Sequence, residues 1–143
     1  MKVAIFASKE FGDKKVLVEA IQASSFKITE IISCVDKTVD KLAEEYADTK
    51  GLEKTLFKVE WNNLDHPDAE IKINSWGKEY NAKAAFIRDN EVIQYCDAAI
   101  VIDDGSLGYT LKKLKESSLQ LYIHSPVNKN NLTSVNGGYV YEF

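Results

Sequence analysis

Short apolar runs alternate with helical patterns along this chain, and this alternation constrains its fold more than any other feature. Apolar runs predict strands at 3–7, 28–32, 55–59, 98–102 and 119–123, whereas apolar residues at helical spacing predict helices over 16–21, 39–47, 80–95 and 111–114. Strands that alternate with helices typically form a parallel sheet with helices on both faces and right-handed crossovers. We therefore expect an α/β three-layer sandwich with a mostly parallel sheet of about five strands.

The 143 residues are expected to form a single domain, 1–143, because no linker, repeat or low-complexity tract divides them. We expect a core over 1–125 and a C-terminal tail over 126–143, in which the alternating segment 139–143 predicts a last strand after a Gly-rich turn. The turn-rich stretch 60–80 is typical of a lid or binding loop, and the alternation at 71–74 indicates a short edge strand within it.

Composition argues against two classes of partner. No apolar run approaches the length of about 20 residues that a membrane span needs, and the opening run at 1–6 is too short for a signal peptide, so we expect a cytoplasmic protein without a membrane partner. The formal net charge is −4 and the lysines are scattered, which disfavours nucleic acid. Cys34 and Cys96 lie far apart in apolar surroundings, which indicates buried, reduced thiols.

The predicted strand at 98–102 runs into a turn over 103–110 that contains Gly105, Ser106 and Gly108, and then into a helical pattern. Such a turn points backbone N–H groups and the positive end of the helix dipole at one spot, which favours an anion such as phosphate. The segment fits neither the Walker motif nor G-x-G-x-x-G, so a plain turn with Ser106 as the helix N-cap is the alternative. A strand order of 3-2-1-4-5 would place this turn opposite the loop at 7–10.

Two charged features accompany this turn. Asp103 and Asp104 precede it, where they would bind Mg²⁺, hold ribose hydroxyls or cap the helix; no third metal ligand is evident, so we expect no metal. Arg88 shares the apolar stripe of its predicted helix and needs an anionic partner there. That partner is either a ligand phosphate, which suits the fork of the guanidinium, or an internal carboxylate such as Asp104 or Asp40.

Five stretches, taken in order, carry a resemblance to a known family. Residues 5–11 resemble a G-S-R-x-F turn, 33–47 resemble S-G-G-A-x-G-A-D with its helix, and the segment before Trp61 resembles a strand followed by a Trp. Residues 84–89 resemble A-G-x-x-R-N and 104–110 resemble D-G-x-S-x-G-T. The chain thus resembles the SLOG superfamily of Rossmann-like nucleotide-binding domains, related to DprA and the LOG phosphoribohydrolases, and above all its small single-domain branch of bacterial and phage proteins.

The resemblance implies a Rossmann-like fold and a set of ligand-binding positions: Ser8, Ser33, Asp40, Arg88, Asp104, Gly105, Ser106, Gly108 and Thr110. We add Lys9, which stands where the family has an Arg. The departures from the family bear on activity. Cys34 and Val35 stand where the family has a double glycine, Thr38 replaces a later glycine, and the P-G-G-x-G-T-x-x-E signature with its catalytic Glu is absent. The resemblance therefore implies binding without turnover, with no catalytic residue and no cofactor.

We accordingly expect non-catalytic binding or sequestration of a nucleotide-derived small molecule, an ADP-ribose-type or cyclic-nucleotide signal; in a phage this would be a counter-defence protein in the host cytoplasm. Arg88 and Lys9 would neutralise phosphates, and Asp40 or Asp104 would accept from ribose hydroxyls. One alternative is a hydrolase of N-glycosidic or phosphate bonds with Asp104 or Asp40 as the acid/base. Another is a structural or protein-interaction module, since the tail strand predicts a homo-oligomer.

Overall fold

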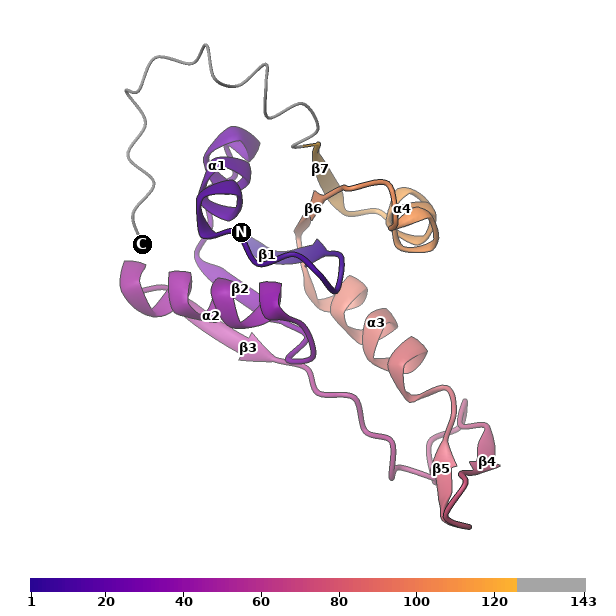
Figure 1. Cartoon of the computed structure of the whole chain (residues 1–143). Helices are drawn as coiled ribbons and strands as arrows, with labels where there is room; N and C mark the ends of the chain where they lie inside the picture. The colour runs from indigo at the N-terminus through magenta and orange to yellow at the C-terminus, as the bar shows by residue number, and fades with distance from the viewer. Residues whose placement is uncertain (126–143) are drawn as a thin grey trace.

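The computed structural model describes residues 1–125, which contain a five-stranded parallel sheet between two pairs of helices (Figure 1). The strands are β1 (Lys2–Ala7), β2 (Glu30–Ser33), β3 (Glu53–Leu56), β6 (Ala98–Ile102) and β7 (Gln120–His124), in the order β3-β2-β1-β6-β7. The helices are α1 (Lys14–Ser24), α2 (Thr38–Lys50), α3 (Ala84–Tyr95) and α4 (Gly108–Lys115). This arrangement confirms the predicted Rossmann-like three-layer fold. The tail strand predicted at 139–143 lies outside the described residues.

The two faces of the sheet are covered by different helices because side chains alternate along each strand. Val3 and Ile5 point to the face that α1 and α2 cover, where they pack with Leu17 and Leu42. Ala4 lies on the opposite face, in a cluster with apolar side chains of α3. Farther along that second face, β6 packs against α4. All five residues of β6 are buried, as the continuous apolar run predicts for a central parallel strand.

Residues 60–80 differ from the expectation. Ile71–Ile73 (β4) is no edge strand of the main sheet, because it pairs antiparallel with β5 (Glu79–Asn81) in a separate two-stranded sheet. The predicted helix over 80–95 therefore begins only at Ala84. The side-chain oxygen of Asn81 accepts from the N–H groups of Glu70 and Lys83, which joins the hairpin to the start of α3. In addition, β3 ends at Leu56 and does not reach residue 59.

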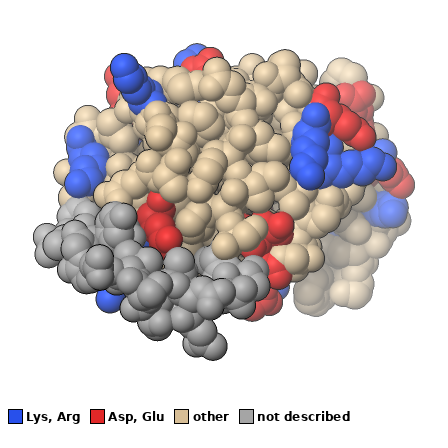
Figure 2. Space-filling view, turned by 90° about the horizontal axis from the view of Figure 1, so that it is seen from above, with Lys and Arg blue, Asp and Glu red and all other residues tan. Residues whose placement is uncertain are grey.

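Charge on the surface follows the scattered pattern of the sequence. Figure 2 shows one face from above, on which Lys and Arg form separate small groups around a broad area without charge, with Asp and Glu beside them. Within residues 1–125, none of the helices has both the length and the hydropathy that crossing a bilayer requires.

Candidate functional site

The carboxyl ends of β1, β2 and β6 meet at the point where the strand order reverses, which is where parallel α/β sheets bind ligands. A hollow of about 390 Å³, partly open to solvent, lies there beside Ala7 at the end of β1. The polar side chains that line it come from the loop after β2, from α2, from α3 and from α4: Asp36, Lys37, Asp40, Arg88, Asp89 and Thr110. The fold thus brings together residues from four separate segments of the chain.

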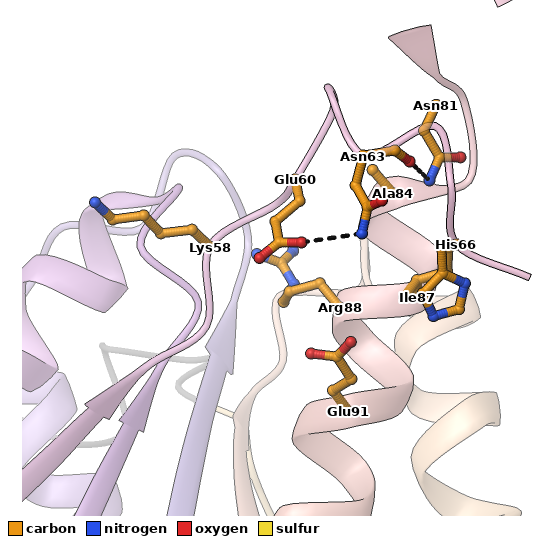
Figure 3. Close-up of a pocket in the computed structure, with 9 residues that line it drawn as sticks. All are labelled: Lys58, Glu60, Asn63, His66, Asn81, Ala84, Ile87, Arg88 and Glu91. Carbon is orange, nitrogen blue, oxygen red and sulfur yellow. Dashed lines mark hydrogen bonds between the residues drawn. The ribbon is translucent and has the colours of Figure 1, made fainter. Parts of the chain in front are cut away.

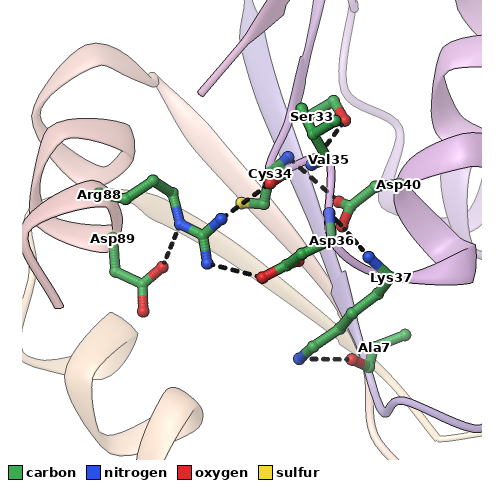
Figure 4. A network of polar contacts seen from close by, with 9 residues as sticks. All are labelled: Ala7, Ser33, Cys34, Val35, Asp36, Lys37, Asp40, Arg88 and Asp89. Atoms are coloured by element: carbon green, nitrogen blue, oxygen red, sulfur yellow. Dashed lines mark hydrogen bonds and ion pairs between the residues drawn. The ribbon is translucent and has the colours of Figure 1, made fainter. Parts of the chain in front are cut away.

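Arg88 is bound by internal partners on three sides (Figure 4). Its Nε donates to Asp89 Oδ1 at 2.8 Å, Nη1 donates to the Cys34 carbonyl oxygen at 2.8 Å, and Nη2 donates to Asp36 Oδ2 at 3.1 Å. The side chain is 8% exposed. Burial alone would lower the pKa of Arg88, but the acidic groups beside it outweigh burial and raise the pKa above its ordinary value.

These contacts answer the question that the sequence left open for Arg88. Internal carboxylates bind it, but they are Asp36 and Asp89 and not the expected Asp104 or Asp40. A guanidinium has five N–H donors, and three of them are used here, so two remain for a ligand. Arg88 therefore holds the loop after β2 in place and keeps a reduced capacity to bind an anion.

A second hollow, of about 280 Å³, lies on the other side of Arg88, between α3 and the segment that follows β3 (Figure 3). Lys58, Glu60 and His66 line it from that segment, and Arg88 and Glu91 line it from α3. The two cationic side chains of this lining, Lys58 and Arg88, are matched by two carboxylates, Glu60 and Glu91. Arg88 thus separates two small polar hollows and contributes to both.

Asp40 lies in the first turn of α2, and its carboxylate points back into the loop that follows β2. Its carboxylate accepts from three backbone N–H groups, those of Cys34 at 3.2 Å, Asp36 at 3.2 Å and Lys37 at 3.0 Å. The residue is 2% exposed, and this burial raises the pKa of its carboxyl to about 6 against the lowering effect of the three amides. The loop therefore already holds an internal anion.

The loop after β2 has the backbone shape of a glycine turn although it contains no glycine. Val35 has φ = 66°, a left-handed conformation that a β-branched residue rarely adopts. This is the place of the double glycine in the motif that 33–40 resembles. Ser33 Oγ accepts from the Val35 N–H at 3.2 Å and donates to Glu44 at 2.8 Å. Ser33 is fully buried and is not among the residues that line the hollow, although it was expected to bind ligand.

The turn at 103–106 also satisfies its own N–H groups. Gly105 N–H donates to Asp103 Oδ1 at 2.8 Å, and Ser106 N–H donates to Asp104 Oδ1 at 2.9 Å. Gly105 has φ = 93°, which only glycine adopts without strain. The expected N-cap role of Ser106 is wrong, because α4 begins at Gly108 and the Ser106 hydroxyl donates to Asp104. Two amides of the proposed phosphate loop, those of Gly105 and Ser106, are therefore taken by carboxylates of the same turn.

Asp104 joins this turn to the end of β1. Hydrogen bonds from the hydroxyls of Ser106 and Ser8 lower the pKa of Asp104 to about 2. The loops after β6 and β1 are therefore in contact, as expected for neighbouring parallel strands. Lys9, Gly105, Ser106 and Gly108 are exposed. Within residues 1–125, no group of three or more His, Cys, Asp and Glu side chains is arranged to hold a metal ion.

Three of the predicted residues meet at the hollow, namely Asp40, Arg88 and Thr110. Sequence reasoning missed Asp36, Lys37 and Asp89, which line it as well. The available signal was adjacency, since Asp89 follows Arg88 directly and Lys37 lies beside Asp40 in the chain. The lining contains two cationic side chains and three carboxylates, so it has no excess of positive charge.

No model of a known protein family matches this chain, and neither a curated protein nor a solved structure matches it. The resemblance to the SLOG superfamily therefore stays a prediction, and the fold and the geometry of the hollow carry the functional proposal.

Proposed function

We propose that this chain binds a nucleotide-derived small molecule, of the ADP-ribose or cyclic-nucleotide class, in the hollow beside Arg88 and releases it unchanged. The observation that carries the proposal is the position of this hollow at the carboxyl ends of β1 and β2, with partly exposed carboxylates of Asp36 and Asp89 on its rim. Ligands of parallel α/β sheets bind at this edge.

The balance of charge favours ribose hydroxyls as the main anchor. Ionised carboxylates accept strong hydrogen bonds from hydroxyl groups, and Asp36 and Asp89 are held in place for this by Arg88. Lys37, whose Nζ contacts the Ala7 carbonyl oxygen at 3.4 Å, and the two remaining N–H groups of Arg88 would take one phosphate of the ligand. A bare polyphosphate is disfavoured, because three carboxylates outnumber two cations.

The low pKa of Asp104 supports the proposal that the ligand is released unchanged. A general acid needs a pKa near the working pH, whereas the pKa of Asp104 is lowered to about 2. A protein that binds such a signal without turnover would act by sequestering it.

Hydrolysis of an N-glycosidic bond is the second candidate, and one observation favours it. Asp40 lines the hollow, and its pKa is raised to about 6, which suits an acid that donates a proton to a leaving group. Incubation of ADP-ribose or NAD with the protein, followed by chromatography, separates the two candidates. Intact ligand supports binding, whereas a product that is lost in the Asp40→Asn variant supports hydrolysis.

Calorimetry tests the binding proposal with ADP-ribose, NAD and a cyclic dinucleotide. We expect one of them to bind, and Asp36→Asn to weaken it about tenfold, which corresponds to about 1.4 kcal/mol. Asp48→Asn is the matched control, because Asp48 is an exposed carboxylate at the far end of α2 that pairs with Lys54. An analogue of the bound ligand without ribose hydroxyls should lose affinity as well. Absence of heat with all three ligands, in a folded sample, would overturn the proposal.

A further inference from the structure

The hairpin of β4 and β5 carries a group of exposed apolar side chains. Ile71 is 53% exposed, Ile73 is 67% exposed and Trp76, in the turn, is 87% exposed. Figure 1 shows the hairpin beyond the start of α3, away from the five-stranded sheet. A two-stranded hairpin of this length is marginally stable by itself, and uncovered apolar surface of this kind is typical of an interaction site.

The outer edge of β4 is open to another strand. Glu70 C=O accepts from Ala82 N–H at 2.7 Å, and Asn74 N–H donates to Lys78 C=O at 2.9 Å, so these groups face β5. Successive residues of a strand point their N–H and C=O groups to opposite edges. The N–H and C=O groups of Ile71 and Ile73 therefore face away from β5. Within residues 1–125 no further strand pairs with β4.

The other edge of the hairpin is already occupied. Asn81 N–H, on β5, donates to the Trp61 carbonyl oxygen at 2.7 Å, and the Asn81 side chain donates to the Asn63 carbonyl oxygen at 3.1 Å. The segment after β3 thus covers the β5 side, and an added strand would bind along β4.

The charges on β4 are complementary to a second copy of the same strand. Glu70 and Lys72 lie on one face, with the carboxylate and ammonium 3.6 Å apart, and Ile71 and Ile73 lie on the other. If two β4 strands pair antiparallel with Ile71 opposite Ile71, each Glu70 lies opposite the Lys72 of the other copy. The same register places the isoleucines of both copies on one continuous face.

Other symmetric registers lack this match. A register centred on Lys72 places two ammonium groups opposite each other, which is destabilising. A register centred on Ile73 places Lys72 opposite Asn74 and leaves Glu70 without a cationic partner across the strands. A single register therefore combines apolar contact with two cross-strand ion pairs.

We propose that two copies of this chain associate through their β4 strands, which form a continuous four-stranded antiparallel sheet about a two-fold axis at Ile71. The sheet order would be β5-β4-β4-β5. The occupant of the edge is a second copy because the pattern of Glu70, Ile71 and Lys72 is its own complement. This association is independent of the ligand in the hollow, and a small interface of this kind predicts a weak, concentration-dependent dimer.

Analytical ultracentrifugation of the full chain over about 1 to 500 µM tests the proposal, a range that covers weak dimers. We expect a monomer–dimer equilibrium in the unchanged protein. Glu70→Lys and Lys72→Glu each place like charges opposite each other and should weaken the dimer at least about tenfold. The double variant E70K/K72E restores opposite charges and should restore the dimer. It also restores the ion pair between residues 70 and 72 within each chain, so disulfide trapping separates pairing between copies from a defect within one copy. Circular dichroism checks that each variant is folded.

Disulfide trapping gives a second measurement with its own control. Ile71→Cys places two thiols across the two-fold axis at a Cα separation of about 5.5 Å, within the range for a disulfide. Trp76→Cys is more exposed, yet the register places its two copies more than about 20 Å apart, so it should not form a cross-link. The native thiols, Cys34 and Cys96, are buried.

Three outcomes would overturn the proposal. They are a monomer at every concentration, a dimer that neither single charge reversal weakens, and a cross-link that forms as readily at position 76 as at position 71. A dimer that neither charge reversal weakens would have its interface on another surface. Loss of ligand binding at Asp36 would leave the dimer unchanged, so the two proposals fail separately.

Discussion

The guanidinium of Arg88 donates from Nη1 to the carbonyl oxygen of Cys34 at 2.8 Å and thereby joins α3 to the loop that follows β2. The N–H groups of the same loop point the other way, toward the Asp40 carboxylate. One cation and one anion thus satisfy the backbone of this loop from opposite sides. Since buried backbone groups need partners, both side chains stabilise the loop whether or not a ligand is present.

Replacement of Arg88 tests the first half of this arrangement. Arg88→Ala leaves the Cys34 carbonyl without its donor and Asp36 and Asp89 without their cation, and should lower the free energy of unfolding by about 2 kcal/mol. Because Asp36 and Asp89 are partly exposed, this loss of stability is smaller than the loss expected when one partner of a fully buried ion pair is removed. Urea denaturation measures it. Lys54→Ala, which removes the surface ion pair with Asp48, should lower the free energy of unfolding much less than Arg88→Ala does, and an equal loss would contradict the assignment.

Val35 is expected to lower stability through its backbone. Because φ is 66°, its side chain is strained, and Val35→Gly should raise the free energy of unfolding by about 1 kcal/mol, since relief of the left-handed conformation exceeds the greater entropy of the unfolded chain. Val35→Ala keeps a Cβ atom and should give no comparable gain. Thermal denaturation followed by circular dichroism compares the three proteins, and a less stable glycine variant would refute the prediction.

Asp40 is expected to make stability depend on pH. Its pKa is raised from 3.8 to about 6 in the folded protein, mainly by burial, so the folded state binds the proton more tightly than the unfolded state does. Its contribution to stability is therefore fully present below about pH 4 and is lost as the pH rises through about 6, by about 3 kcal/mol in total.

Carbon-13 NMR of the aspartate carboxyls measures this pKa directly, and we expect the Asp40 resonance to titrate with a midpoint near 6. Denaturation of the unchanged protein and of Asp40→Asn, compared from about pH 4 to 7, should show a difference that varies with pH in the stated direction. A midpoint below 4 would mean that the three amides outweigh burial.

Both cysteines are expected to be unreactive in the folded protein. Burial raises the pKa of the Cys34 and Cys96 thiols to about 12, so the thiolate fraction at pH 8 falls more than about a thousandfold below that of free cysteine. Ellman's reagent should therefore react with neither thiol until guanidinium unfolds the protein, when both react. Rapid labelling of one thiol under native conditions would show that its cluster opens locally.

The predicted parallel sheet is confirmed because the prediction depends on a repeating pattern. Buried parallel strands have continuous apolar runs, such as Ala98–Ile102, and amphipathic helices between them leave few possible topologies. The hairpin was missed as a unit because each of its strands has three residues, too few for a period to be read. Tyr80 looked helical from its spacing but pairs with Lys72, 8 residues earlier.

The candidate site was predicted in outline but not in its charges. The resemblance implied Arg88, Asp40 and Thr110 as ligand-binding positions, and the structure brings these three residues together at one edge of the sheet. Which acid binds which base depends on distances of a few ångströms between loops, which residue spacing does not encode. For the same reason the sequence could not indicate that Asp40 and Asp104 accept from backbone amides of their own loops.

The carboxylate at the start of α2 has a consequence for the energetics of binding. Three converging amides are already in contact with an acceptor, so the loop needs no guest to become ordered. A molecule that enters the adjoining hollow meets a wall that was preorganised during folding, and little of its affinity is lost to conformational entropy. A small hollow with such a preorganised wall can therefore bind its ligand tightly.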